Sequence, residues 1–347
     1  MAPDLHFPPR NGDSMEDPKF PMKISIAVLT SITLGVFAVC AGCNSASRTT
    51  GSADRSVETT DASRTAAANT PQPQKPEPKS GETRSVEPQV QSEIEKAEAE
   101  RRASLLKDAQ SALEETRNAL AALDKGDSKA ALAALARASG ELDLVLSRDP
   151  HLALAPVSVD TVVYDFYATP DTVKTVVKQA RGDLSDDRVQ QARRELMYLV
   201  SEVDLNVAEL PLASYPAAIR AVSPLIDQGK TQDAKAALDA ALNSLVINSL
   251  VIPLPRVRAD ALLTEAQQIT SKPDHTQPDQ QQKARSLIAA ARNEVQLAEA
   301  LGYGTKSDYK PLYNEIDNLQ KAAESGNAGS GLFDRVRQSL RRLKFFS

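Results

Sequence analysis

The residues able to do chemistry are few, and their spacing does not suit catalysis or metal binding. The histidines are His6, His151 and His275, and none has a second ligand at helical or hairpin spacing. Zinc sites need three or four such ligands held together. No serine lies in a nucleophile-elbow motif. The sequence therefore predicts no catalytic residue, no metal and no cofactor, and we expect that the chain is not an enzyme.

Two acidic pairs adjoin segments rich in β-branched residues. They are Asp160 with Asp165, and Glu202 with Asp204. A carboxylate buried there would hold its proton to a higher pH, because burial disfavours the charged form, and could act as a pH switch. A solvated strand face or a turn cap is the alternative, and the sequence favours it.

The segment Gly302–Asp308 has some features of a phosphate-binding loop. It lacks the Walker spacing, however, and no strand precedes it. A glycine C-cap, then Ser307 or Asp308 as the next N-cap, with Pro311 in the first helical turn, also accounts for it. The tyrosines in and after this loop are candidate ligand or interface residues, with core packing as the alternative: Tyr303, Tyr309 and Tyr313.

Both cysteines lie at the end of one apolar run. Residues 24–41 contain no charge and follow Lys23. A short basic region, an apolar stretch and small residues before a cut site are typical of a secretory signal peptide. Ala41-Gly42-Cys43 also resembles a bacterial lipobox, which implies lipidation of Cys43, although Cys40 replaces the usual aliphatic residue. Ordinary cleavage nearby and an uncleaved anchor are the alternatives.

This signal divides the N-terminal part of the chain. Residues 1–21 indicate a translation start placed too early, or an extension of the basic region, and residues 22–42 are the predicted signal peptide. Residues 43–89 are predicted to be a disordered spacer rich in Ser, Thr and Pro, because they cannot bury enough apolar area to offset chain entropy. By analogy with lipoproteins, Asn44 favours the outer membrane. We expect an exported, periplasmic protein with a lipid anchor there.

The end of the chain, 327–347, is predicted to be a glycine hinge and a basic amphipathic tail. Such a helix suits an anionic lipid surface or an acidic partner groove. A last helix docked on the core, or a frayed tail, is the alternative. The basic residues are the candidate membrane or partner contacts: Arg335, Arg337, Arg341, Arg342 and Lys344. The apolar residues are Leu332, Phe333, Val336, Leu340, Leu343 and Phe346.

Between these segments, residues 90–326 are predicted to form packed helical hairpins. Residues 92–123 have the pattern of one long helix that ends at Gly126, with Ser128 as the next N-cap. The buried pattern there returns 103 residues later: Ala131, Leu135, Ala138 and Leu142, then Ala234, Leu238, Ala241 and Leu245. Weaker copies are Ala192, Leu196 and Leu199, and Ala284, Ile288, Ala291 and Val295. The irregular spacing argues against a regular tetratricopeptide array.

Three segments interrupt the helical pattern with β-branched and aromatic residues. They are residues 157–167, 203–212 and 245–254. We expect two or three short strands, with Pro253 confining its strand to an edge or an end. The predicted fold class is therefore mainly α, with packed helical hairpins and two or three short β-strands.

The order of several motifs over about residues 105–325 resembles the YfdX family of exported bacterial proteins. The motifs are residues 164–170 (YDFYATP), 210–212 (LPL), 215–219 (YPAAI), 236–243 (AALDAALN), 251–255 (VIPLP), 300–304 (ALGYG) and 308–309 (DY). The resemblance implies a mainly helical periplasmic protein tied to envelope stress, including acid or drug stress, and often oligomeric. It carries no catalytic residues. The lipobox and the long spacer are additions to that pattern.

The predicted function combines these observations. A net charge of −5 argues against a nucleic-acid surface, which needs clustered positive charge. We expect a non-enzymatic envelope protein that acts in a stress response by binding a protein or a small molecule. The alternatives are a structural tether that uses the C-terminal basic helix, and a periplasmic holdase. We also expect that copies of the chain associate into a homo-oligomer.

Overall fold

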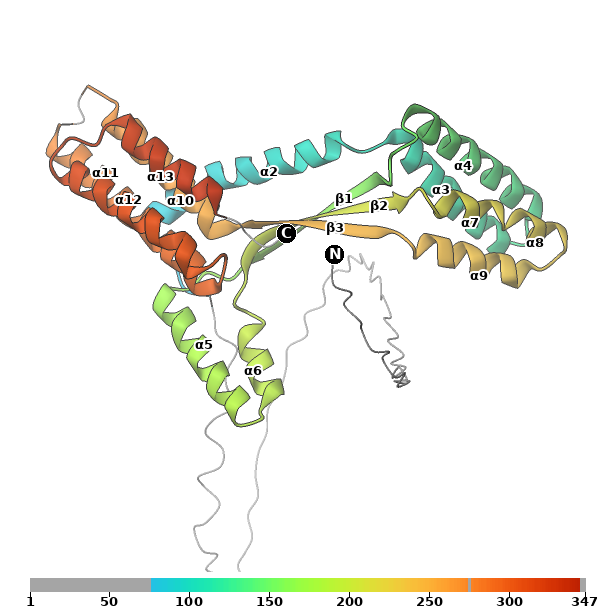
Figure 1. The fold of residues 1–347 in the computed structure, drawn as a ribbon, viewed down its shortest axis with the longest axis horizontal. Helices are drawn as coiled ribbons and strands as arrows, with labels where there is room; N and C mark the ends of the chain where they lie inside the picture. Colours follow the sequence, from blue (N-terminus) through green and yellow to red (C-terminus); the bar gives the residue numbers. More distant parts are fainter. Residues whose placement is uncertain (1–75, 274–275, 344–347) are drawn as a thin grey trace, which may run out of the picture. The chain divides into compact units, whose positions relative to one another are not determined.

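Helices make up most of the described structure, around one small antiparallel sheet (Figure 1). The computed structural model describes residues 76–273 and 276–343, all within the unit Ala67–Ser347. The predicted signal peptide, Cys43, His6, His275 and Lys344 lie outside the described residues. No helix in the described part has the length and hydropathy needed to cross a membrane. The mainly α fold class is confirmed.

The elements follow one another in this order. Before the first long strand lie α1 (Gly81–Ser85), α2 (Glu87–Ala103), α3 (Lys107–Asp124) and α4 (Ser128–Arg148). Then come β1 (Leu154–Asp165), α5 (Pro170–Ser185), α6 (Val189–Leu196), β2 (Ser201–Pro211), α7 (Tyr215–Arg220), α8 (Ser223–Asp227), α9 (Thr231–Leu242) and β3 (Val246–Pro253). The last helices are α10 (Leu254–Thr270), α11 (Pro278–Leu301), α12 (Lys306–Glu324) and α13 (Ser330–Arg342).

The three predicted strand segments all form strands of one sheet. Their order is β1-β2-β3, and both pairs are antiparallel. Val203 of the central strand pairs with Val163 on one side and with Ile252 on the other. Pro253 is the last residue of an edge strand, as expected, because its missing N–H would interrupt a central ladder. The strands β1 and β2, at 12 and 11 residues, are longer than the short strands expected.

A first hydrophobic core joins α3, α4, α7 and α9 to the adjoining ends of β1 and β2. It contains both copies of the main repeat, since Leu135 and Leu238 are both buried in it. Each copy follows a glycine with positive φ, Gly126 at 75° and Gly229 at 72°. This confirms the repeated turn. The N-cap of α4 is Asp127, whose carboxylate accepts from Ala130 N at 2.9 Å, and not Ser128 as predicted.

A second hydrophobic core contains α2 and α10–α13, with Val203 and Leu205 from β2. The weaker repeat copy on α11, including Ile288 and Val295, is buried in it. The copy on α6 does not form a core face, because Ala192 is buried but Leu196 is exposed. The two cores therefore meet along β2, whose other end contributes Leu210 to the first core.

Two predicted boundaries are wrong. The long helix over 92–123 is interrupted at residues 104–106, where Leu106 N leaves the helix and donates to Pro156 O at 3.0 Å. Order also begins before residue 90, because α1 and the start of α2 lie within the predicted spacer. Ser80 caps α1 by accepting from Thr83 N at 3.0 Å, and Val86 is fully buried. A few specific polar contacts therefore order a segment that composition alone predicts to be disordered.

The predicted C-terminal hinge and free tail are also wrong for the described residues. Helix α13 packs in the second core, where Phe333, Val336 and Leu340 are buried. The Arg337 guanidinium also donates two hydrogen bonds to the carboxylate of Asp260 on α10, at 2.9 and 3.1 Å. The alternative of a last helix docked on the core is the one that the structure supports.

Candidate functional site

A group of charged side chains surrounds one buried arginine where α2, β1 and α10 meet. Arg258 of α10 is only 1% exposed. Its Nη2 donates to both carboxylate oxygens of Asp165, at 2.8 and 2.9 Å, and its Nε donates to Glu87 Oε1 at 3.1 Å. Lys79 Nζ lies 2.8 Å from a carboxylate oxygen of each of the same two acids. Two cations and two anions thus neutralise one another, and we call these four residues the Arg258 cluster.

Glu294 of α11 is a third carboxyl group beside this cluster, and it is 1% exposed. Its Oε1 accepts from the Thr83 hydroxyl at 3.0 Å, while its Oε2 has no hydrogen-bond partner among the described residues. Burial raises the pKa of Glu294 to about 7, although Arg258, Thr83 and Tyr167 favour the charged form. The site can therefore gain or lose a proton near neutral pH.

Asp165 and Tyr167 each keep one charge state near neutral pH. Burial alone would raise the pKa of Asp165, but Arg258 and Lys79 bring it below its ordinary value. The Arg258 guanidinium lies 5.6 Å from the centre of the Tyr167 ring. Burial, and then Glu294, raise the pKa of Tyr167 to about 12, so this phenol stays neutral. Glu294, in contrast, titrates near neutral pH.

Sequence reasoning placed the acid switch beside the strands, and only one of its candidates belongs to this site. Asp165 binds Arg258, whereas Asp160 is exposed and Glu202 is partly exposed. Burial also raises the pKa of Asp204, which like Glu294 has one buried carboxylate oxygen without a hydrogen-bond partner among the described residues, but Asp204 lies outside this site. A signal for Glu294 did exist, because it lies three residues after the buried Ala291 on the apolar stripe of α11.

The three candidate tyrosines have roles within the helical packing. The hydroxyl of Tyr303 accepts from Ser201 N at 3.1 Å, and the hydroxyl of Tyr309 donates to Tyr303 O. The hydroxyl of Tyr313 donates to Glu299 Oε2 at 2.6 Å. The loop before them ends α11 at Gly302 with φ 88°, as predicted.

The start of the next helix differs from the prediction. Its N-cap is Thr305, in a capping box with Asp308, and not Ser307 or Asp308 itself. Pro311 lies inside α12, beyond the first turn. The loop is thus explained by helix-capping geometry, and its tyrosines tie α11, α12 and β2 together.

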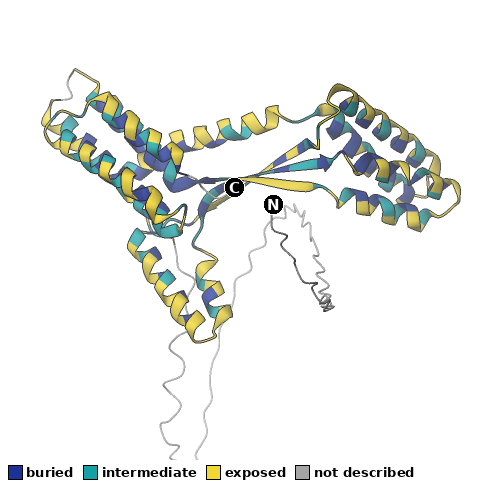
Figure 2. Cartoon of the chain, viewed as in Figure 1, coloured by how far each residue is buried: buried dark blue, intermediate teal, exposed yellow. Residues whose placement is uncertain are grey.

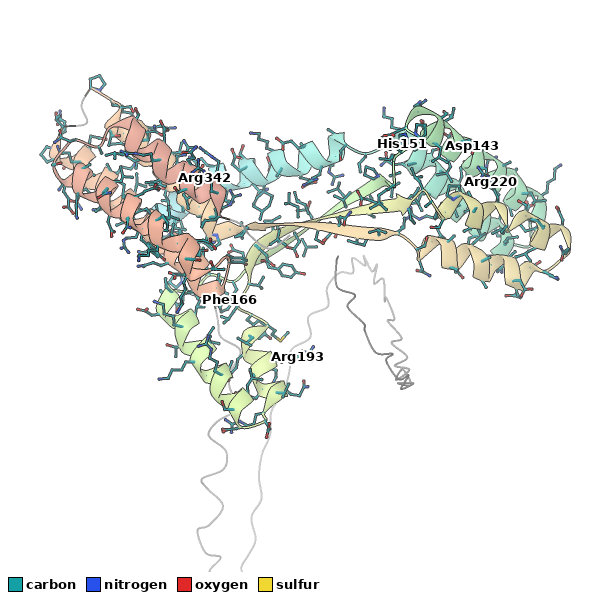
Figure 3. The ribbon with its side chains drawn as sticks, in the orientation of Figure 1. Asp143, His151, Phe166, Arg193, Arg220 and Arg342 are labelled. Atoms are coloured by element: carbon teal, nitrogen blue, oxygen red, sulfur yellow. The ribbon has the colours of Figure 1, made fainter. Side chains whose placement is uncertain are left out.

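The predicted C-terminal contacts divide into two groups. Arg337 is engaged with Asp260, whereas Arg335, Arg341 and Arg342 are exposed (Figure 3). His151 is also exposed, beyond the end of α4 and among the helices of the first core, where Figure 3 labels it with the ion-paired Asp143 and Arg220. The structure therefore does not bring His151 and the C-terminal arginines together.

A second surface of interest is the edge strand β3. Val246, Ile247 and Leu250 are exposed, as are the intervening Asn248 and Ser249 (Figure 2). Among the described residues the backbone ladder of β3 runs to β2 alone. The sequence predicts this strand and its edge position. The exposure of side chains on both faces of the strand is seen only in the structure.

Comparison with known proteins links part of this fold to one family. The model of the family described as YfdX protein matches residues 112–251, from α3 into β3. The match includes the sheet and most of the first core, but it ends before Arg258 and Glu294. No curated protein matches the chain.

The chain is also similar in part to solved structures. A crystal form of Salmonella Typhi YfdX aligns with 43% of this chain and 93% of its own, at 17% identity and a TM-score of 0.30. That TM-score is too low to indicate a shared fold, so the link to the family depends on the sequence match. Residues 112–251 of the chain thus match the YfdX family in sequence.

Proposed function

We propose that the chain is a non-enzymatic binding protein of the bacterial cell envelope that acts in a stress response. In this proposal it is exported, anchored by a lipid on Cys43, and binds a partner protein as an added strand along β3. The observation that carries the binding role is the open edge of β3. Of the two ligand classes expected from the sequence, protein and small molecule, this geometry favours protein.

The composition of β3 is unusual for an exposed edge. Natural edge strands are commonly guarded by charges, prolines or bulges, because their unpaired N–H and C=O groups can pair with another chain. Residues 243–252 contain no charge and no proline, and Ile247 and Leu250 are exposed. Backbone groups would supply affinity for an added strand, and these side chains would supply selectivity.

Acidic side chains on the neighbouring strand define the chemistry of the partner. Glu202, Asp204 and Glu209 of β2 pair across the ladder with Pro253, Val251 and Val246. None of the three forms an ion pair among the described residues. An added strand would lie about 10 Å from β2, so the acids would steer a basic segment more than bind it tightly. The favoured partner is therefore an extended aliphatic segment with flanking Lys or Arg.

Site-specific photo-crosslinking in the intact envelope tests this proposal. A photoreactive residue replaces Ile247, and the matched control carries it at Val163 on β1, since these aliphatic residues are 57% and 56% exposed. We expect a discrete adduct from position 247 that is absent from position 163. Leu250→Lys should abolish that adduct, because it places a charge in the contact.

The crosslinking outcomes distinguish the partners. An adduct with twice the mass of the chain identifies a second copy, which is the homo-oligomer, and another mass identifies a different protein. Equal labelling from both positions, or an adduct unchanged by Leu250→Lys, would contradict binding at β3.

The envelope location needs its own measurement. The intact mass of membrane-extracted protein, compared with Cys43→Ala, reports the lipid anchor. Finding the full-length chain unprocessed in the cytoplasm would rule out export.

A holdase is the second candidate, favoured by the hairpin of α5 and α6. Leu184, Val189, Leu196 and Met197 are exposed there, and large exposed apolar patches bind unfolded chains or partners. If this surface holds clients, Met197→Lys should weaken suppression of client aggregation, whereas Leu144→Lys on α4 should not. The tether alternative has less support, because the apolar face of α13 is covered.

A further inference from the structure

The segment of residues 76–86, here called the N-terminal strap, is held mainly by polar contacts. Glu77 N donates to Tyr167 O at 2.7 Å, and the Glu77 carboxylate accepts from Thr169 N at 2.9 Å. Thr83 and Val86 are its only buried residues. A segment with so little buried apolar area opens at a lower free-energy cost than a core helix. The strap can therefore respond to a change at one of its few anchor points.

One anchor point is the hydrogen bond from Thr83 to Glu294, at 3.0 Å. Arg258 and Lys79 are already committed to Asp165 and Glu87, so an ionised Glu294 would add an unbalanced negative charge to the buried site. A neutral carboxyl avoids that charge and can still accept from Thr83. The docked strap covers Glu294, so a charge there favours the undocked state, in which water reaches the carboxylate.

We propose that the N-terminal strap is a proton-controlled latch, docked while Glu294 is protonated and released when Glu294 ionises. Releasing the strap frees residues 76–86 from α11 and from Tyr167, just after the end of β1. The latch uses residues other than those of β3, so the proposal stands without the proposed function.

The direction of the pH response follows from the two states. In the docked state burial raises the pKa of Glu294 to about 7, whereas in the open state the group returns toward its ordinary value of 4.5. Between these values the docked state holds one more proton, so its population falls as pH rises, by at most about tenfold per pH unit. The ratio of docked to open strap should level off above about pH 7 and below about pH 4.5.

The groups around Glu294 are ion-paired, hydrogen-bonded or apolar. Lys79, Glu87, Asp165 and Arg258 face Glu294 from the strap, α2, β1 and α10 as mutually paired ions, and Tyr167 stays neutral. On α11 itself, Arg292 pairs with Asp317 of α12 and Glu299 accepts from Tyr313, also of α12. The neighbouring helix α5 presents Val173 to Leu297 of α11.

Hydrogen exchange of the full chain, read by mass spectrometry from about pH 4.5 to about pH 8.5, tests the latch. Exchange rates are corrected for the chemical rate at each pH, and peptides covering residues 77–90 report the strap. We expect their protection to fall steadily between about pH 5 and 7 and then to level off. Peptides of α4, in the other core, should show no such step and serve as the internal control for folding.

Two variants make the assignment specific. Glu294→Gln is neutral at every pH and should remove the step, leaving the strap protected throughout. Glu299→Gln is the matched control, about one and a half turns along the same helix, and it should keep the wild-type step. A wild-type strap whose protection does not change between about pH 5 and 7, or a step that survives in Glu294→Gln, would overturn the proposal.

Discussion

Arg258 is a buried cation, and its environment explains how the fold tolerates it. Burial alone would lower its pKa, but the carboxylates of Asp165, Glu294 and Glu87 raise it, so the guanidinium stays charged. Removing Arg258 would leave Asp165 and Glu87, each about a third exposed, with one cation in place of two. The Arg258 cluster is thus a set of interdependent residues that fixes where α2, β1 and α10 meet.

This dependence gives a prediction for Arg258→Met. The variant keeps much of the side-chain volume but leaves Lys79 to balance two carboxylates. We expect a loss of about 1.5–3 kcal/mol in the free energy of unfolding at neutral pH, measured by urea denaturation, because both carboxylates keep contact with water and with Lys79. The loss should shrink in acid, because the lowered pKa of Asp165 means that its stabilising charge is lost as pH falls.

A matched control is the exposed Arg341→Met, expected to change stability by no more than about 0.5 kcal/mol. If the two variants were equally stable, the buried ion pairs would have no structural role.

At the residue scale, the sequence contains a signal for the buried charged site that helical periodicity alone does not reveal. Arg258 lies four residues after the buried Leu254 and four before the buried Leu262, on the apolar stripe of α10. A charge on such a stripe predicts a buried polar site. Its partners could not be predicted, because Glu87 and Asp165 are 171 and 93 residues away in sequence.

Among the elements, α13 shows how an amphipathic pattern can be read in two ways. A basic helix with one apolar face suits a lipid surface, and it equally suits a last helix docked on a core. The sequence shows the two faces but not what covers the apolar one. The long helix predicted over 92–123 has a similar ambiguity, since its break depends on the contact of Leu106 with β1.

Docking of α13 predicts that Phe333→Ala destabilises the second core. Phe333 is fully buried, and truncating such a ring costs about 3–5 kcal/mol. Arg335→Ala on the exposed face of the same helix is the control and should have little effect on urea unfolding. A wild-type unfolding curve for Phe333→Ala would instead indicate a helix that detaches freely.

On the scale of the whole described unit, two hydrophobic cores share one sheet. Sequence analysis placed residues 90–326 in one helical domain and found the 103-residue repeat, whose two copies lie in the first core. It could not divide the helices between cores, because apolar stripes look alike whichever neighbours cover them. The family match also separates these two groups of helices. It ends within β3 and does not reach α10–α13.

Two cores predict local responses to core substitutions. Leu238→Ala in the first core should cost about 2–5 kcal/mol and speed hydrogen exchange in α3, α4 and α9 more than in α11 and α12. Leu312→Ala in the second core should show the reverse pattern. Equal changes throughout both groups of helices would mean that the cores unfold as one unit.

The junction of β3 and α10 has a mechanical consequence. The strand ends at Pro253 and the helix begins at Leu254, so no loop lies between them that could take up a rotation of the strand. A change in the twist of β3 is therefore passed directly to the first turn of α10, and Arg258 lies only one turn further along. Rotating that turn would move the guanidinium relative to Asp165 and Glu87, so a partner that twists the edge strand would also act on the Arg258 cluster.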